Sequence, residues 1–123
     1  MKEFPEFMKN PANKIASENQ YTPNISGYVF DGADGSQMAF WTNPDGGKST
    51  EHIHDYDEYV VVVQGRYTVI IDEKRHILDV GAEFLIPKGT PHSGESISGT
   101  RTIHAFGGKR ASRVATERKG FTS

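Results

Sequence analysis

Two histidines lie one residue apart at positions 52 and 54, in the segment EHIHDYDE. In an extended chain, residues two apart point to the same face and are separated by about 6.6 Å. The imidazoles of His52 and His54 can therefore converge on one metal ion with bonds of about 2.1 Å, while Ile53 faces the other way. Two exposed polar side chains on the solvated face of a strand would show the same spacing.

Glu58 supplies a carboxylate to the same region. In one straight strand it would lie about 13 Å from His54, too far away to share a metal ion. Residues 55–57 (DYD) have turn-forming chemistry, and a turn there brings Glu58 back beside His54. Glu58 also precedes residues 59–63 (YVVVV), a run typical of a strand covered on both faces. A carboxylate buried at such a strand needs a partner, and a divalent cation is one.

These residues belong to two longer patterns. Residues 46–65 fit G-x(5)-H-x-H-x(3)-E-x(6)-G, and residues 81–96 fit G-x(5)-P-x-G-x(2)-H-x(3)-N with Ser96 in the last position. The two patterns resemble the paired motifs of the cupin superfamily, and their short spacer is similar to that of small single-domain cupins. The resemblance implies an all-β fold, a double-stranded β-helix (jelly-roll) barrel with short N- and C-terminal extensions. It also implies one divalent metal ion held by four side chains, namely His52, His54, Glu58 and His92.

The implied ligand set indicates which metals the site accepts. Three imidazoles and one carboxylate, without sulfur, suit iron, manganese, nickel, cobalt, copper or zinc. Open positions on such an ion allow polarisation of a carbonyl or enolate, or joint binding of substrate and dioxygen. The alternative is a cupin in which the four side chains form an internal hydrogen-bond cluster without a metal.

The resemblance leads us to expect a metal-dependent enzyme of the dioxygenase, isomerase or lyase type, acting on a small oxygenated organic molecule. A non-catalytic module that binds or senses a sugar-like molecule or an organic acid is the alternative, because one fold hosts many functions. If His104 points into the barrel, it is a candidate general base, and the alternative is a surface or structural histidine. The substrate pocket is expected to be lined by Phe40, Trp41, Val60, Val62 and Phe106.

Short runs of β-forming residues must position this site. They cover residues 28–30, 38–42, 59–63, 67–71, 77–80, 84–86 and 102–106. Gly, Asp, Asn and Pro separate the runs, which favours an antiparallel sandwich or barrel. Two Asp-Gly pairs, at residues 31–32 and 34–35, predict a hairpin between the first two runs. Alternation places His104 on one strand face together with Thr102 and Phe106.

We expect three parts in the chain: an N-terminal arm at residues 1–20, the barrel at 21–107 and a basic tail at 108–123. Phe4, Phe7 and Met8 have helical spacing, but nearby prolines limit any helix to a turn or two. The arm is expected to pack on the barrel or on a second subunit. The tail has five basic side chains against one acidic one, and we expect it to be solvated, with steering of an anionic ligand as the alternative.

Composition narrows the class of protein. The chain has 123 residues, a length suited to one domain, and a net charge of −2, which argues against a nucleic-acid partner. It lacks an apolar run of membrane-spanning length and an apolar stretch of the signal-peptide type near residue 1. With no cysteine in addition, we expect a cytoplasmic protein with a small-molecule ligand and no membrane partner. The resemblance further suggests a homodimer.

Overall fold

The computed structural model describes residues 1–16, 22 and 24–114. Two short 3-10 helices, η1 (Glu6–Lys9) and η2 (Pro11–Asn13), precede the strands. The strands of the described residues are β1 (Ser26–Asp31), β2 (Gln37–Asn43), β3 (Gly47–Lys48), β4 (Glu58–Gln64), β5 (Tyr67–Ile71), β6 (Lys74–Leu78), β7 (Glu83–Ile86), β8 (Ser93–Ser96) and β9 (Thr100–Phe106). Within the described part of the chain, no helix is long and apolar enough to cross a membrane.

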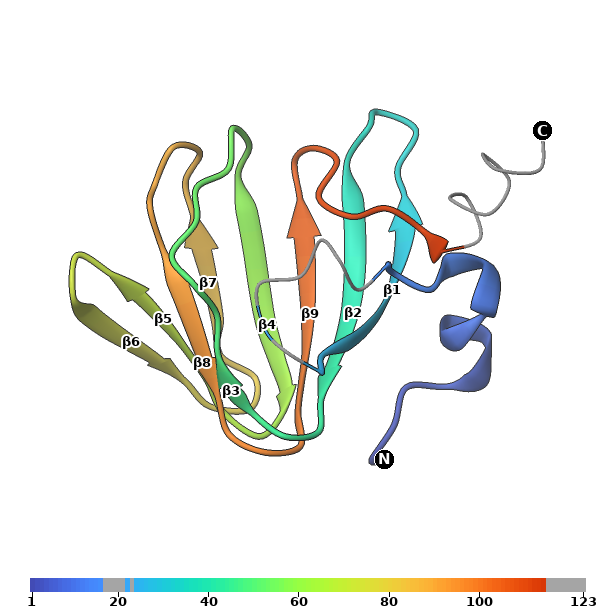
Figure 1. Ribbon diagram of the computed structural model, residues 1–123, viewed down its shortest axis with the longest axis horizontal. Helices are drawn as coiled ribbons and strands as arrows, with labels where there is room; N and C mark the ends of the chain where they lie inside the picture. The colour runs from blue at the N-terminus through green and yellow to red at the C-terminus, as the bar shows by residue number, and fades with distance from the viewer. Residues whose placement is uncertain (17–21, 23, 115–123) are drawn as a thin grey trace.

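The strands form two antiparallel sheets that face each other (Figure 1). One sheet has the order β1-β2-β9-β4-β7 and the other has the order β3-β8-β5-β6. Strand β9 lies at the centre of the larger sheet, where His104 pairs with Ala39 on one side and with Val60 on the other. This arrangement confirms the predicted all-β jelly-roll fold.

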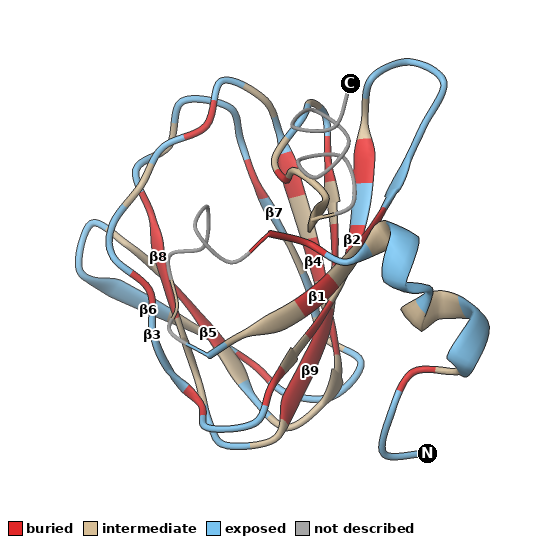
Figure 2. Cartoon of the chain, turned by 45° about the vertical axis from the view of Figure 1, so that its right-hand side comes forward, coloured by how far each residue is buried: buried red, intermediate tan, exposed pale blue. Residues whose placement is uncertain are grey.

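Burial alternates along the strands, so that one face of each sheet forms the interior (Figure 2). Two apolar clusters fill this interior at different places. The first consists of Ile15, Val29, Ala39, Trp41, Phe106 and Ala111. The second consists of Val60, Val62, Val69, Leu78 and Ile86. The metal-ligand candidates lie between the sheets near these clusters, not on the outer surface, since three of the four are buried.

Six of the seven runs of β-forming residues lie wholly within strands, and β5 has the expected bounds. The run at 77–80 is shifted, because β6 begins at Lys74 directly after a tight turn at Asp72 and Glu73. Strands β3 and β8 are not evident from the sequence. The residues of β8 are Ser-Gly-Glu-Ser, and they are extended because they pair with β5 and β3. Tertiary pairing here outweighs a weak local preference.

The described part of the N-terminal arm packs against the barrel of the same chain. Phe4 is only 7% exposed, and its ring lies edge-on to Phe40 with centroids 5.7 Å apart. The guanidinium of Arg101 lies 4.7 Å from the centre of the Phe4 ring and donates to the Met1 carbonyl. Phe7, by contrast, is 77% exposed. Phe4 is therefore the main anchor of the arm.

Replacing Phe4 with alanine is expected to lower the free energy of unfolding by about 3 kcal/mol, because it removes a buried ring and its contact with a cation. The matched change, Phe7→Ala, removes the same kind of side chain from an exposed position. It should change the free energy of unfolding by less than about 0.5 kcal/mol. Urea denaturation of both variants measures the difference. Equal effects would show that the arm does not dock in solution through Phe4.

The first residues of the predicted basic tail are packed, which differs from the expected solvated segment. Ala111 is 2% exposed, and the main chain of residue 114 donates to the carbonyl of Lys14. Arg113 forms an ion pair of 2.7 Å with Asp31 and donates to the Val29 carbonyl. Residues 17–20 of the predicted arm and 115–123 of the predicted tail lie outside the described residues, so the boundaries at 20 and 107 stay predictions.

Candidate metal centre

The four side chains that the motifs single out come together between the two sheets. The ligand atoms of His52, His54, Glu58 and His92 all lie within 4.8 Å of one another. His52 and His92 face each other across an isolated antiparallel bridge with two backbone hydrogen bonds of 2.9 Å. Glu58 begins β4, paired with Ile86 of β7 and with Phe106 of β9. Segments far apart in the sequence thus hold the cluster, which we call the metal centre.

The chain between His54 and Glu58 bends at residues 55–56 instead of continuing as a strand. This bend places His54 Nε2 3.2 Å from Glu58 Oε1, as the turn-forming DYD sequence indicates. The ring of Tyr56 stacks on His54 with centroids 4.8 Å apart. Ile53 is 58% exposed and faces away from the metal centre.

Hydrogen bonds at Nδ1 set the orientation of the three imidazoles. Nδ1 of His52 and Nδ1 of His92 each lie 2.8 Å from the backbone carbonyl two residues earlier. Nδ1 of His54 lies 3.2 Å from the hydroxyl of Tyr56. A carbonyl only accepts, so Nδ1 of His52 and of His92 carries the proton, and Nε2 presents a lone pair. Nε2 is then the atom that these rings offer to a metal.

Three buried atoms at this point have no hydrogen-bond partner among the described residues: His54 Nε2, His92 Nε2 and Glu58 Oε1. The two nitrogens lie 3.2 Å and 3.4 Å from the oxygen, within ion-pair distance but without hydrogen-bond geometry. Leaving each such atom unsatisfied costs about 1–3 kcal/mol, and a cation among them removes that cost. The donor set fits a divalent transition metal, and it does not form a satisfied hydrogen-bond cluster.

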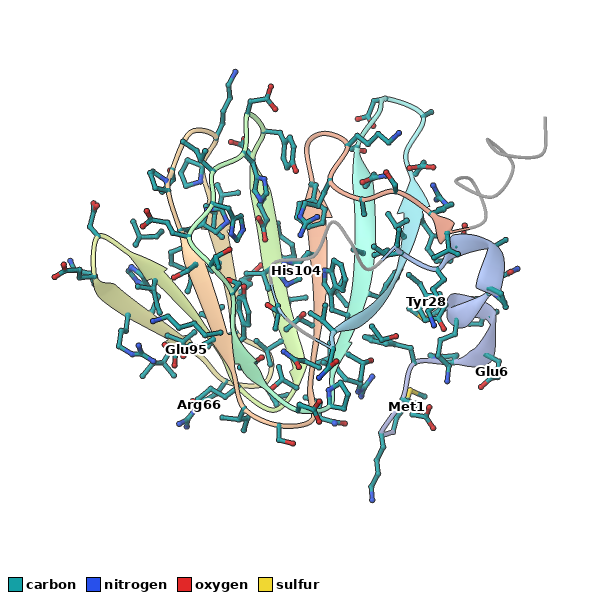
Figure 3. The ribbon with its side chains drawn as sticks, in the orientation of Figure 1. Met1, Glu6, Tyr28, Arg66, Glu95 and His104 are labelled. Atoms are coloured by element: carbon teal, nitrogen blue, oxygen red, sulfur yellow. The ribbon has the colours of Figure 1, made fainter. Side chains whose placement is uncertain are left out.

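His104 contacts the other oxygen of Glu58. His104 is 6% exposed and lies between the sheets (Figure 3). Its Nδ1 lies 2.8 Å from Glu58 Oε2, and its Nε2 lies 3.1 Å from the hydroxyl of Thr102. A neutral ring with the proton on Nδ1 satisfies both contacts, because it donates to the carboxylate and accepts from the hydroxyl. The inward orientation is the one that a general base requires, yet both ring nitrogens have partners, so that role stays a prediction.

The surroundings shift the pKa values of the ligands. Burial alone would raise the pKa of Glu58. The contacts with His104, His54 and His92 lower it by a larger amount, so the pKa lies below its ordinary value. Glu58 is therefore ionised at neutral pH. Burial lowers the pKa of His52 to about 4, so its imidazole is neutral there. Burial also lowers the pKa of His92, but Glu58 and a backbone carbonyl more than offset this and place it above the ordinary value.

A cavity opens between the sheets beside His52 and Glu58. Its lining includes aromatic, polar and cationic side chains, among them Trp41, Asn43, Tyr67, His104, Phe106 and Arg110. Tyr67 fits there because its hydroxyl lies against Gly94, where any side chain would collide with it. A ligand of the metal centre would thus meet a cavity wall of mixed chemistry.

Two of the five predicted pocket residues, Trp41 and Phe106, line this cavity. Phe40 does not, because it lies on the opposite face of β2, in contact with Phe4 and with Phe30. Val60 and Val62 face inward but are not in the lining, since they are 0% and 1% exposed within the second apolar cluster. The pocket prediction therefore needs correction at these three positions.

The sequence reasoning missed Asn43, Tyr67 and Arg110. Asn43 lies two residues after Trp41 on β2, so strand alternation could have placed it on the same inner face. Tyr67 begins a strand that was predicted, but only the pairing of the sheets shows that its ring reaches the cavity. Arg110 follows β9 in an irregular segment, for which no periodic signal exists.

Comparisons with known proteins bear on the fold. The sequence model of the cupin domain matches residues 39–106. The search of curated proteins found no match. Among solved structures, an RmlC-like cupin from Shewanella frigidimarina NCIMB 400 is 18% identical, with 88% of this chain and 90% of that chain covered and a TM-score of 0.69.

Two further solved structures have the same fold. KdgF from Halomonas sp. is 20% identical, with 78% of this chain and 93% of that chain covered and a TM-score of 0.65. The polyketide cyclase RemF from Streptomyces resistomycificus is 16% identical, with 93% and 85% covered and a TM-score of 0.68. The family match spans more than half of the chain and contains the whole first motif-bearing segment, residues 46–65, and the second, residues 81–96. The chain therefore belongs to the cupin family.

Proposed function

We propose that this cupin is a metal-dependent enzyme that acts on a small oxygenated organic molecule at the metal centre. The observation that carries the proposal is the convergence of His54 Nε2, His92 Nε2 and Glu58 Oε1, all buried and without a partner among the described residues. The cavity beside them is lined by His52 and Glu58 of the same cluster. Dioxygenation is the reaction type we favour, followed by isomerisation and a lyase reaction.

Each residue has a distinct part in this proposal. His52, His54 and His92 offer Nε2 and Glu58 offers Oε1 to one divalent ion of iron, manganese, nickel, cobalt, copper or zinc. Such an ion supplies Lewis acidity or redox chemistry at its open positions. His104 donates to Glu58 Oε2 and keeps the carboxylate turned toward the histidines. A homodimer and a cytoplasmic location stay predictions.

The chemistry of the cavity favours an enzyme over a passive binding module. A pocket lined only by Val, Phe and Trp would offer nothing but shape beside the metal. Here His104, Tyr67 and Arg110 also reach the lining, and each can bind or transfer a proton or hold a charge. RemF, a polyketide cyclase in name, shows that an enzyme uses this fold, although a fold alone does not imply an activity.

Turnover measurements test the enzymatic part. Protein loaded separately with iron(II), manganese(II) or nickel(II) is incubated with a panel of small oxygenated molecules while oxygen uptake and product formation are followed. The proposal expects turnover with at least one metal, and no turnover with metal-free protein or with His54→Ala. Tight binding of panel members by the loaded protein, with no product from any of them, would instead identify a binding module.

Metal affinity is expected to fall as the pH decreases. An imidazole binds a metal only when it is neutral, so protons compete with the ion. The pKa of His92 lies above its ordinary value, whereas that of His52 is about 4, so His92 takes up a proton at a higher pH than His52 does. Below the pKa of His92 the affinity should fall by at least about tenfold for each pH unit. Titrations with manganese between about pH 5.5 and 8.5 would contradict this expectation if the affinity stayed constant throughout.

A further inference from the structure

Tyr67, the first residue of β5, carries a hydroxyl group that the fold places at the cavity. Its ring packs against the second apolar cluster and lies edge-on to His104, with centroids 5.6 Å apart. Tyr67 shares the cavity lining with His52 and Glu58 of the metal centre. A ring that is held by its neighbours loses little further freedom when its hydroxyl binds a ligand, so this position suits a group that recognises one.

The hydroxyl of Tyr67 is displaced toward the metal centre. Tyr67 pairs with Ser96 of β8, yet its hydroxyl lies against Gly94, where a β-carbon would collide with it. Gly94 is buried and lies two residues after the buried His92 in an extended segment, so the two residues share the inner face about 7 Å apart. The ring of Tyr67 therefore leans along β8 in the direction of a metal ligand.

This hydroxyl group is available to a ligand. It has no hydrogen-bond partner among the described residues, and it is not one of the sealed, unpartnered atoms at the metal centre. Neighbouring hydroxyls are already used, since that of Ser49 accepts from the Gly94 N–H and that of Thr102 contacts His104. A tyrosine hydroxyl is protonated at neutral pH, and burial raises the pKa of Tyr67 further. Tyr67 thus offers a hydrogen-bond donor to the cavity.

We propose that the hydroxyl of Tyr67 donates a hydrogen bond to an oxygen atom of the molecule bound at the metal centre. That molecule must then present an acceptor, such as an enolate, carboxylate or carbonyl oxygen, on or beside the atom that binds the ion. A buried donor discriminates strongly, because a ligand without the acceptor leaves it unpaired. The inference rests on the proposed function for the metal ion, and it adds an acceptor oxygen to what the substrate must carry.

Protein loaded with cobalt(II) provides the test, because the visible absorption of this ion changes when a ligand binds to it. The first probe, acetohydroxamate, binds metals through oxygen atoms that also accept hydrogen bonds. The second probe, imidazole, has a similar size, but once one nitrogen binds the ion it keeps only an N–H donor. Tyr67→Phe removes the hydroxyl alone, and the matched control is Tyr59→Phe, whose hydroxyl donates to Glu83 at the surface. Cobalt content is measured in every sample.

We expect Tyr67→Phe to bind acetohydroxamate about 10- to 100-fold more weakly than wild type does, with unchanged cobalt content. Its affinity for imidazole should change by less than about twofold, and Tyr59→Phe should match wild type with both probes. An acetohydroxamate affinity that is absent in wild type or unchanged in Tyr67→Phe, at full cobalt content, would overturn this inference alone. An equal loss for imidazole would also overturn it, because the effect would then come from the shape of the cavity.

The same samples separate this inference from the proposed function. A wild-type protein that holds no cobalt would overturn both. A loss of acetohydroxamate affinity that is specific to Tyr67→Phe, in a protein that turns over no small oxygenated molecule, would support the hydrogen bond from Tyr67 while the enzymatic proposal fails.

Discussion

Replacing His92 with alanine is expected to abolish stable metal binding, with the metal content falling from about one ion per chain to below about one tenth. His92 is 2% exposed, and its Nε2 has no other partner among the described residues. Changes to residues that merely support a ligand weaken metal binding by about 10- to 100-fold, so loss of a ligand should cost at least as much. Elemental analysis after dialysis measures the metal content.

The control for His92→Ala is the same substitution at a histidine outside the metal centre. His76 lies on β6 against the ring of Phe84 and is not one of the four clustered side chains, so His76→Ala should keep its metal. Circular dichroism of both variants shows whether the fold persists. A folded His92→Ala protein with wild-type metal content would remove His92 from the ligand set.

A second large loss of metal affinity is expected when His104 is replaced. Two different substitutions at this position distinguish a positioning role from a general-base role. His104→Leu leaves Oε2 of Glu58 buried without its donor, and metal affinity should fall about 10- to 100-fold. His104→Asn places an amide N–H where it can donate to the same oxygen, and it should restore most of that affinity. Isothermal titration with zinc or manganese measures both variants.

Turnover by His104→Asn then decides between the two roles. An amide can hold Glu58 but cannot take up a proton at neutral pH. Full metal binding with near-normal turnover would establish His104 as a positioning residue, and full metal binding without turnover would establish it as the general base. Unchanged metal affinity in His104→Leu would contradict the positioning role of the contact between His104 and Glu58.

The sequence was most informative where two signals agreed. The spacing of His52 and His54 alone fits a solvated strand equally well, but the paired motifs added Glu58 and His92 and implied the jelly roll. The DYD segment predicted the bend that returns Glu58 to the histidines, and the structure has that bend. Turn chemistry is local, so it can be recognised without knowledge of the sheet pairing.

The missed features depend on non-local pairing. Alternation places Phe40 and Trp41 on opposite faces of β2, but only the packing of the first apolar cluster shows that Trp41 faces inward. Val60 lies on the same strand face as Glu58, and the packing of the second apolar cluster closes the cavity before it reaches that depth. The contact between His104 and Glu58 likewise requires the register of β4 against β9, which no local pattern encodes.

Binding of one divalent ion by these four side chains would be seen in an anomalous-difference map from crystals grown with manganese or zinc. We expect a single strong peak between the two sheets, about 2.0–2.3 Å from Nε2 of His52, His54 and His92 and from Oε1 of Glu58. A map without a peak at this point, or with the ion bound elsewhere on the chain, would contradict the account.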